Sequence, residues 1–363
     1  MDKNDFLYYQ SALALKLPAK LIAEIDGFRI KMGKHRLYFR GGITPFNNIS
    51  SSCIAINKYC MNKLLESSGL PIPRAIAFHR KKFNEESLES LIKNLSFPLV
   101  VKPMKNTALG KDVLCNIDNM DQLNDYMKKC FQDHDFLSVE EFHPQLNAYR
   151  VLVYFNKVIG VVQRYPACVV GDGIHSIKEL IEIHNVEREK FNAKVSLGPI
   201  KVDEEYQIRL NELQMTLDTI PKDKERVVLC YTCNSTRGGT MESLGAKICV
   251  ENARLMCQAA KVLNLNIVGF DVLCEDINIP IVKSRGVIIE ANCNPDITIH
   301  ENPMYGTPNQ VSKKILRRLI FRYPLTYLLG FYRYKQVRVC IKFSTLLLFI
   351  LMAKYLGFGQ VHV

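Results

Sequence analysis

Short apolar runs alternate with amphipathic stretches along most of this chain, and this alternation limits the possible fold more than any other feature. Apolar runs of four to eight residues bounded by turn residues are typical of strands, whereas the stretches between them have the period of helices. Strands interleaved with helices predict an α+β or α/β protein. Several strands that follow one another directly predict a sizeable antiparallel sheet.

The expected elements can be assigned to residue ranges. Strand-like runs occupy residues 97–103, 112–117, 136–142, 149–155, 157–165, 226–233, 266–275 and 286–293. Helical patterns cover residues 57–69, 85–95, 119–131, 176–185, 203–215, 246–263 and 310–321. Pro71 and Pro73 follow the first helix and favour an extended exit, so we expect that helix to end at Gly69.

The composition is that of an ordinary globular protein. Of the 363 residues, 48% are hydrophobic and 23% are charged, which excludes a disordered or collagen-like chain. This length suits two or three subdomains around a shared site. We expect an N-terminal segment at 1–52, a small subdomain at 53–137, a large subdomain at 138–322 and a C-terminal tail at 323–363.

The positive charge is concentrated at the C-terminal end. Residues 302–363 hold ten Lys and Arg residues and no Asp or Glu, so the formal net charge of +12 leaves only +2 for the preceding residues. A nearly neutral body argues against nucleic acid as a partner, whereas a basic tail suits a membrane surface or another anionic partner.

The tail also contains an apolar run at 343–353. Its 11 residues fall short of the roughly 20 that a membrane-spanning helix needs. An interfacial helix and a helix packed against the core fit this run equally well.

The twelve cysteines are too sparse for a disulfide scaffold. The first residues lack signal-peptide character, so we expect reduced thiols and a cytoplasmic protein. Cys230 and Cys233 form a Cys-x-x-Cys pair inside an apolar run. Because no second pair completes a zinc set, buried thiols are the favoured interpretation.

The common phosphate-binding and zinc motifs, GxxxxGK[ST], a complete GxGxxG and HExxH, are absent. Acidic and amide side chains instead stand at strand ends, at Asp271, Glu290 and Asn292. In an extended chain Glu290 and Asn292 project from the same side. Two carboxylates and an amide oxygen suit Mg²⁺ whose shell is completed by nucleotide phosphates. The alternative for each residue is a solvated strand end.

Two lysines also stand at the ends of predicted elements. Lys102 closes an apolar strand and Lys58 begins a helix; each could reach phosphates or be an ordinary surface lysine. The polar segment after Lys102, which includes Gly110, could cover phosphates with its backbone amides.

Arg150 and Arg164 fall on neighbouring predicted strands. Two arginines on one face suit a carboxylate or an acyl phosphate, and the alternative is a pair of surface charges. The small-residue loop that starts at Asn234 could hold an oxyanion, or could simply connect two elements.

In this order and spacing, the segments resemble the ATP-grasp superfamily, most closely the ATP-grasp domain of cyanophycin synthetase and of bifunctional glutathione synthetases. The matching segments are residues 57–58, 99–103, 139–142, 149–153, 163–181, 234–240, 269–273 and 288–306. They extend from about Cys53 to Arg322. The resemblance implies an α+β fold whose two subdomains grip ATP between them.

The resemblance also implies roles for single residues. Two lysines would grip the ATP phosphates, Glu140 would meet the adenine amino group, and the following backbone would form the hinge. The implied catalytic residues are Arg150, Arg164 and Asn234; the nucleotide-binding residues are Lys58, Lys102, Gly110, Glu140, Glu141, Phe142 and His143; and the ligands of Mg²⁺ or Mn²⁺ are Asp271, Glu290 and Asn292. His300 matches a family histidine of open role.

Four positions depart from the family pattern. Asp112 stands where a glycine is expected, and Ala148 where relatives carry an acidic residue for the ribose. Arg237 interrupts a run usually written STGG, and Asp296 replaces a common glycine. These departures leave a nucleotide-binding protein without ligase activity as the alternative function.

The function that the resemblance implies is that of an ATP-dependent carboxylate–amine ligase. It would join amino acids or small peptides through an acyl phosphate and release ADP and phosphate. The length leaves no room for the second ligase domain of the relatives, so we expect a stand-alone ATP-grasp protein. A homo-oligomer and a peripheral membrane contact through the tail remain open.

Overall fold

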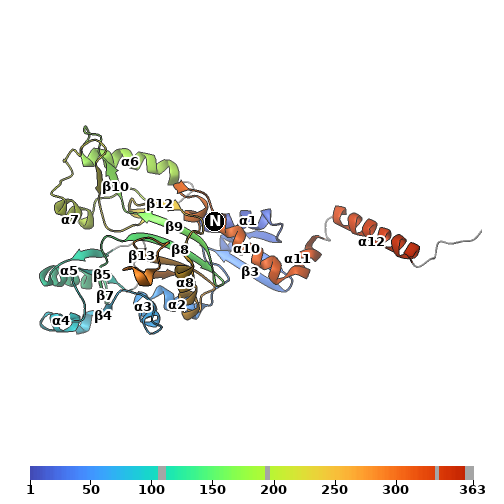
Figure 1. Ribbon diagram of the computed structural model, residues 1–363, viewed down its shortest axis with the longest axis horizontal. Helices are drawn as coiled ribbons and strands as arrows, with labels where there is room; N and C mark the ends of the chain where they lie inside the picture. Colours follow the sequence, from blue (N-terminus) through green and yellow to red (C-terminus); the bar gives the residue numbers. More distant parts are fainter. Residues whose placement is uncertain (105–111, 193–196, 332–334, 356–363) are drawn as a thin grey trace, which may run out of the picture. The chain divides into compact units, whose positions relative to one another are not determined.

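The computed structural model describes residues 1–104, 112–192, 197–331 and 335–355. The chain forms two compact units, whose elements are labelled in Figure 1. The first unit consists of Met1, residues 5–41 and residues 312–363, and the second of residues 2–4 and 42–311. The four-part division expected from the sequence stays a prediction.

The first unit is built on a three-stranded antiparallel sheet that the sequence patterns did not reveal. Its strands are β1 (Ala19–Ile22), β2 (Gly27–Met32) and β3 (His35–Arg40), and its helices are α1 (Lys3–Ala14), α10 (Val311–Arg322), α11 (Pro324–Phe331) and α12 (Lys335–Tyr355). Phe28 and Phe39 stack with ring centroids 4.5 Å apart, and Tyr8 packs against Phe39. Because these rings are fully buried, they anchor α1 to the sheet.

The helix α12 contains the apolar run of the tail. Within the described residues, no helix combines the length and the low charge that crossing a bilayer requires.

The second unit is centred on a six-stranded sheet. Its strands, in spatial order, are β14 (Val287–Asn292), β13 (Ile267–Cys274), β8 (Asn147–Tyr154), β9 (Lys157–Tyr165), β12 (Thr240–Ser243) and β15 (Tyr305–Gly306). All neighbours are antiparallel except β12 and β15. The predicted antiparallel sheet of consecutive strands is therefore confirmed.

Helices cover one face of this sheet. They are α2 (Ile49–Ile56), α3 (Lys58–Glu66) and α8 (Val250–Val262), and the short α9 (Thr298–Glu301) follows β14. Met61 and Leu65 of α3 and Met256 of α8 meet Val151 and Phe270 of the sheet in one buried core.

A second, four-stranded sheet has the order β4 (Ala75–His79), β7 (Phe136–Glu141), β5 (Leu99–Pro103) and β6 (Leu114–Ile117). Its helices are α4 (Glu85–Ile92) and α5 (Met120–Asp133). Asn84 and Asn119 cap these helices by accepting a backbone N–H, a favourable use of asparagine. Leu88, Leu123 and Met127 bury the helices against the sheet.

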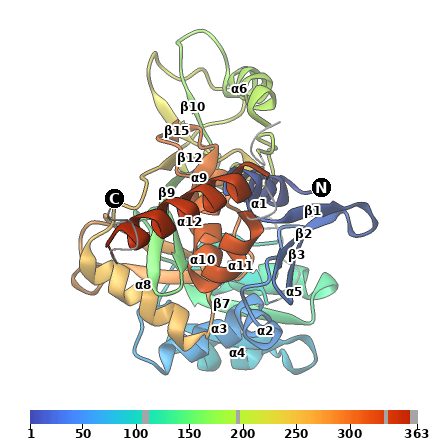
Figure 2. The same cartoon turned by 90° about the vertical axis from the view of Figure 1, so that its right-hand side faces the viewer.

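A third group of elements contains the strand pair β10 (Cys168–Val170) and β11 (Arg226–Val228) with α6 (Ile177–Asn192) and α7 (Glu204–Glu212). In Figure 1 and Figure 2, α6 and β10 lie at one end of the second unit and α4 at the other. The other two groups also touch each other directly, because Asn116 of β6 donates to Glu212 of α7.

Several predicted elements have the wrong extent. The helix expected at 176–185 continues to Asn192, and the helix expected to end at Gly69 ends at Glu66. The strand expected at 226–233 ends at Val228, because the N–H groups of Tyr231 and Thr232 are bonded to a carboxylate.

The helix expected at 246–263 begins only at Val250. Before it, the N–H of Lys247 is bonded to the carbonyl of Leu244 and the N–H of Cys249 to the carbonyl of Ile277, so these residues form a turn and a long-range contact in place of helical bonds.

Candidate functional site

A cavity of about 560 Å³ opens in the second unit. Side chains from all three groups of elements line it. Among them are Lys58, Lys102, Glu140, Glu141, Phe142, His143, Arg150, Arg164, Asn234, Asp271, Glu290 and Asn292. Twelve of the thirteen candidate residues are thereby brought together, and the thirteenth, Gly110, lies outside the described residues.

The three candidate metal ligands lie on the paired strands β13 and β14, with Asp271 in the middle of β13. Asp271 is directly opposite Glu290 in the antiparallel pair, and Asn292 is opposite Gly269. Directly opposed residues project from the same face of a sheet. Asn292 donates its side-chain N–H to the carbonyl of Gly269 at 3.4 Å. The amide oxygen is then the side-chain atom that can coordinate a cation.

Two arginines meet the carboxylate of Asp271. Arg150 donates to it through both Nε and Nη2, the latter at 3.1 Å, and Arg164 donates through Nη1 at 3.3 Å. Burial raises the pKa of Asp271, but the two guanidinium groups outweigh it, and the pKa lies below its usual value. The site therefore holds Asp271 ionised and places two cations beside it.

Lys102 and Glu140 form a buried ion pair. The Nζ of Lys102 lies 2.6 Å from Oε2 of Glu140, and the hydroxyl of Ser138 donates to Oε1 at 2.9 Å. Both carboxylate oxygens are thus engaged by the protein. That Glu140 meets an adenine amino group stays a prediction.

Lys58 is the first residue of α3. Asn57 caps this helix by accepting the N–H of Cys60 at 3.1 Å. Burial lowers the pKa of Lys58, the carboxylate of Glu290 partly offsets this, and the charge of Lys102 lowers it further. An anion bound in the cavity would relieve this repulsion between the two lysines.

The segment expected to form the hinge lies beside the four-stranded sheet. The N–H of Glu141 is bonded to the carbonyl of Arg74 and that of Phe142 to the carbonyl of Pro98. These two N–H groups are therefore not available to a nucleotide. Burial lowers the pKa of His143.

The loop after β11 forms another wall. Asn234, Ser235 and Thr236 line the cavity. Arg237 is absent from the lining and instead pairs with Glu205 and Asp203. The residue that departs from the family pattern therefore does not fill the cavity.

The other departures have separate surroundings. Ala148 and Asp296 line the cavity, and Asp296 accepts bonds from the N–H and hydroxyl of Thr298 at 2.8 and 2.7 Å. Asp112 bonds to His134 at 2.8 Å. His300, by contrast, is fully buried and is not among the lining residues.

Sequence reasoning missed several lining residues, among them Asn4, Cys115, Tyr231 and Cys233. Tyr231 and Cys233 were hidden inside a run interpreted as strand. Asn4 accepts the N–H of Ile297 at 2.8 Å across 293 positions, and no local pattern signals such a contact. Burial raises the pKa of Cys233 to about 12, so it is a neutral thiol at neutral pH.

Comparison with known proteins supports the fold and the resemblance. The cyanophycin synthetase of Synechocystis sp. is 29% identical over 309 residues, which cover 84% of this chain and 35% of that protein. The bifunctional glutathione biosynthesis protein of Listeria welshimeri is 26% identical over 320 residues, covering 87% of this chain and 40% of that protein. The chain thus spans well under half the length of these relatives. No family model matches it.

Among solved structures, a bifunctional glutathione synthetase from Pasteurella multocida superposes with a TM-score of 0.61. The superposition covers 88% of this chain and 43% of that one at 22% identity. The expected resemblance to cyanophycin synthetase and bifunctional glutathione synthetase is confirmed, as is the α+β ATP-grasp fold.

Proposed function

We propose that this chain is an ATP-dependent carboxylate–amine ligase that joins amino acids or small peptides. One observation carries the proposal: two lysines, two arginines and three oxygen donors from distant parts of the chain line a single cavity. The similarity to cyanophycin synthetases and glutathione biosynthesis proteins supports it.

In this proposal the nucleotide lies against the four-stranded sheet. Lys58 and Lys102 face the phosphates as cations, and residues 140–143 lie beside the base. Glu140 keeps Lys102 in place through their 2.6 Å contact. A nucleoside triphosphate is an anion that suits two lysines lining one cavity.

The proposed metal ligands are Asp271, Glu290 and Asn292. Their donors are two carboxylates and an amide oxygen, the hard ligands that Mg²⁺ and Mn²⁺ take, with phosphate oxygens completing the shell. No cluster of three or more His, Cys, Asp or Glu able to hold a metal occurs in the described part of the chain. A metal here therefore depends on the phosphates, and it would neutralise charge on them.

The proposed chemistry has two steps. A substrate carboxylate oxygen attacks the γ-phosphorus of ATP, and the γ-phosphorus–oxygen bond to ADP breaks. An amine then attacks the carbonyl carbon of the acyl phosphate, loses a proton, and phosphate leaves. Arg150 and the loop at 234–239 would stabilise the negative oxygens of both steps, so positioning and electrostatics supply the catalysis.

The test is release of ADP and phosphate from Mg-ATP with a panel of amino acids and small peptides, followed by mass spectrometry of the products. We expect release that requires one carboxylate and one amine substrate and that yields their condensation product. ATP binding without release under any pair would favour the alternative of a nucleotide-binding protein without ligase activity.

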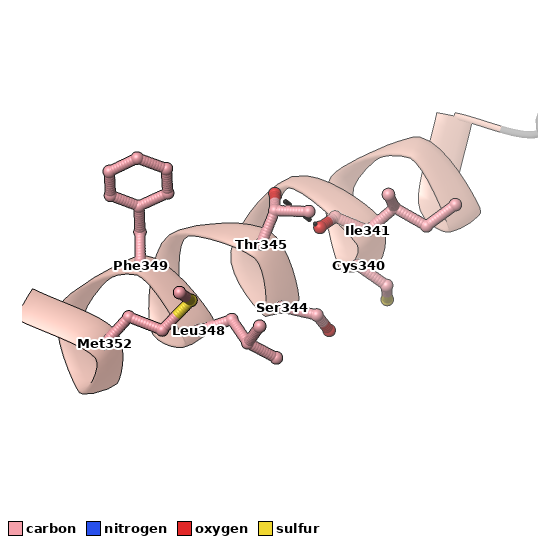
Figure 3. A pocket seen from close by; sticks show the side chains of 7 residues that line it. All are labelled: Cys340, Ile341, Ser344, Thr345, Leu348, Phe349 and Met352. Atoms are coloured by element: carbon pink, nitrogen blue, oxygen red, sulfur yellow. Dashed lines mark hydrogen bonds between the residues drawn. The ribbon is translucent and has the colours of Figure 1, made fainter. Parts of the chain in front are cut away.

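We also propose that α12 binds anionic membrane surfaces. Its residues 343–353 are uncharged and mostly apolar, Lys342 and Lys354 flank them, and Phe343 and Phe349 are 70% and 76% exposed. Figure 3 shows Ile341, Leu348 and Phe349 among the side chains that line a pocket formed by residues of this helix alone. An exposed apolar helix with flanking lysines suits the interface of an anionic bilayer.

Vesicle flotation tests this surface. The full chain should float with vesicles containing phosphatidylserine and less with neutral ones. A variant that carries Phe343→Ser, Leu347→Ser and Phe349→Ser should stay in the dense fraction. Equal flotation of the two proteins would remove the role of α12.

A further inference from the structure

The loop at residues 231–239 has two sides with different surroundings. One side lines the cavity through Tyr231 to Thr236. The other side faces α6 and α7, where two buried charged residues meet its backbone. Neither of them lines the cavity, and the chemistry proposed above does not use them.

Glu205 of α7 binds the start of the loop. Its carboxylate accepts the N–H of Tyr231 at 2.9 Å, the N–H of Thr232 at 2.8 Å and the hydroxyl of Thr232 at 2.9 Å. It also accepts the guanidinium of Arg237 at 2.7 Å. Glu205 is only 4% exposed, and hydrogen bonds to a buried charge are the strong kind. One carboxylate thereby joins both ends of the loop.

Arg188 of α6 binds the end of the loop. Its guanidinium donates to the carbonyls of Ser235 at 2.7 Å, Gly239 at 3.1 Å and Gly198 at 2.8 Å. Arg188 is 6% exposed, and among the described residues it forms no ion pair. Burying a cation against main-chain carbonyls alone costs desolvation free energy. We therefore expect this contact to have a function that offsets the cost.

The loop itself completes the arrangement. Asn234 accepts the N–H and the hydroxyl of Thr236 through its side chain, at 3.0 and 2.9 Å. Its carbonyl accepts the N–H groups of Arg237 and Gly239. The hydroxyl of Tyr206 donates to the carbonyl of Arg237. Most of the contacts that fix the loop therefore come from the side of α6 and α7. The side that lines the cavity is left accessible to a ligand.

We infer that Glu205 and Arg188 are positioning residues that hold the 231–239 loop in the shape that receives the reacting carboxylate. This inference rests on the proposed ligase function for the identity of the ligand. Arg237 takes part as the cation that pairs with Glu205. The two helices act on the reaction through the loop and touch no substrate.

The first experiment measures amide hydrogen exchange of the free protein. Glu205→Gln keeps the shape of the side chain and removes its charge. Exchange in the peptide covering 230–239 should accelerate at least about tenfold, while β8 and β13 keep their protection. The matched control is Glu204→Gln, one residue away, whose exposed carboxylate binds Lys129 at the surface. It should exchange like the wild type.

A second variant separates positioning from folding. Arg188→Lys keeps a buried cation but cannot reach three carbonyls at once, and its control is the exposed Lys190→Gln. The same local acceleration is expected for Arg188→Lys. Wild-type exchange in both variants, or loss of protection throughout the second unit in both, would overturn the inference.

The kinetic readout is specific to positioning. Both variants should bind Mg-ATP within about twofold of the wild type, because Lys58 and Lys102 lie on other elements. Their kcat for product formation should fall about 10- to 100-fold, the effect of a misplaced catalytic wall. Unchanged kcat would refute positioning. If the wild type itself shows no turnover, the proposed function fails, whereas the exchange experiment still decides whether these residues shape the loop.

Discussion

The two ends of the cavity are organised differently. At the end proposed for the phosphates, called the phosphate end, Lys58, Lys102 and Glu140 line the cavity, and Lys102 pairs directly with Glu140. At the loop end, the loop residues that line the cavity are uncharged, and the charged residues Glu205 and Arg188 bind the backbone of the loop from its other side. The difference shows that a single side chain can supply a charge to a cavity, whereas a loop backbone needs hydrogen bonds from several residues to keep its conformation. Variants at the two ends and at Asp271 should therefore differ in which property they change and by how much.

The largest effect is expected at the phosphate end. Lys102→Ala removes a cation from the cavity and should lower turnover more than about 100-fold. The control is Lys129→Ala, whose ion pair with Glu204 is at the surface. Product formation measured for both variants checks this. Full activity of Lys102→Ala would refute the role of the lysine.

Asp271 lines the same cavity and is held by the buried Arg150 and the half-buried Arg164. Asp271→Asn should lower the free energy of unfolding in urea by about 3–5 kcal/mol, because it leaves the buried guanidinium charge of Arg150 without its carboxylate. Glu275→Gln, which breaks only an exposed contact with Arg285, should cost no more than about 1 kcal/mol. Equal stability of the two variants would contradict the buried pair.

The stabilisation by Asp271 should depend on pH in a defined direction. Its folded pKa is lowered, so the contribution is complete above the unfolded value of about 3.9 and is lost as the pH falls below it. The stability difference between wild type and Asp271→Asn should therefore shrink below about pH 4. Urea titrations at pH 3 and pH 6 measure it, and a constant difference would contradict the shift.

A smaller effect is expected at the loop end. A Cβ on Gly198 would lie 1.8 Å from the carbonyl oxygen of Thr236, so Gly198→Ala should displace the loop and cost about 1–3 kcal/mol. Gly330→Ala meets open space and serves as the control in thermal unfolding. Equal melting temperatures for the two variants would mean that the loop does not depend on this close approach.

The smallest effect concerns a thiol in the same loop. Because burial raises the pKa of Cys233 to about 12, almost no thiolate forms at neutral pH. Its alkylation by iodoacetamide should be slow at pH 7 and still rising between pH 9 and pH 10, where a thiol of ordinary pKa, about 8.5, levels off. Mass spectrometry of the Cys233 peptide follows the rate. A plateau near pH 9 would contradict the shift.

The same comparison explains what the sequence could predict. Lys58, Lys102, Arg150, Asp271 and Glu290 were predicted because each is a charged residue at the start of a helix or in an apolar strand run, in the order of a known family. The expected strand-end position is wrong for Asp271, which lies in the middle of β13. Antiparallel pairing then brings Asp271 opposite Glu290. Such residues can be located from local pattern and family resemblance together.

The supporting residues could not be predicted. Glu205 and Arg188 each occur in a polar helix, where a charged residue is normally interpreted as solvated, and their partners are 26 and 47 positions away. Nor did the first unit's sheet show a pattern, because β1 has only four residues, none of them fully buried. The loop-supporting residues and the three-stranded sheet both depend on tertiary contacts, which the periodicity of the sequence does not reveal.

The most direct test of the proposed chemistry follows an oxygen atom. A carboxylate substrate labelled with ¹⁸O is supplied with Mg-ATP and its amine partner, and the released phosphate is analysed by mass spectrometry. Attack of the carboxylate on the γ-phosphorus predicts one ¹⁸O in the phosphate for each amide bond formed. Amide product accompanied by unlabelled phosphate, or by AMP in place of ADP, would contradict the acyl phosphate route.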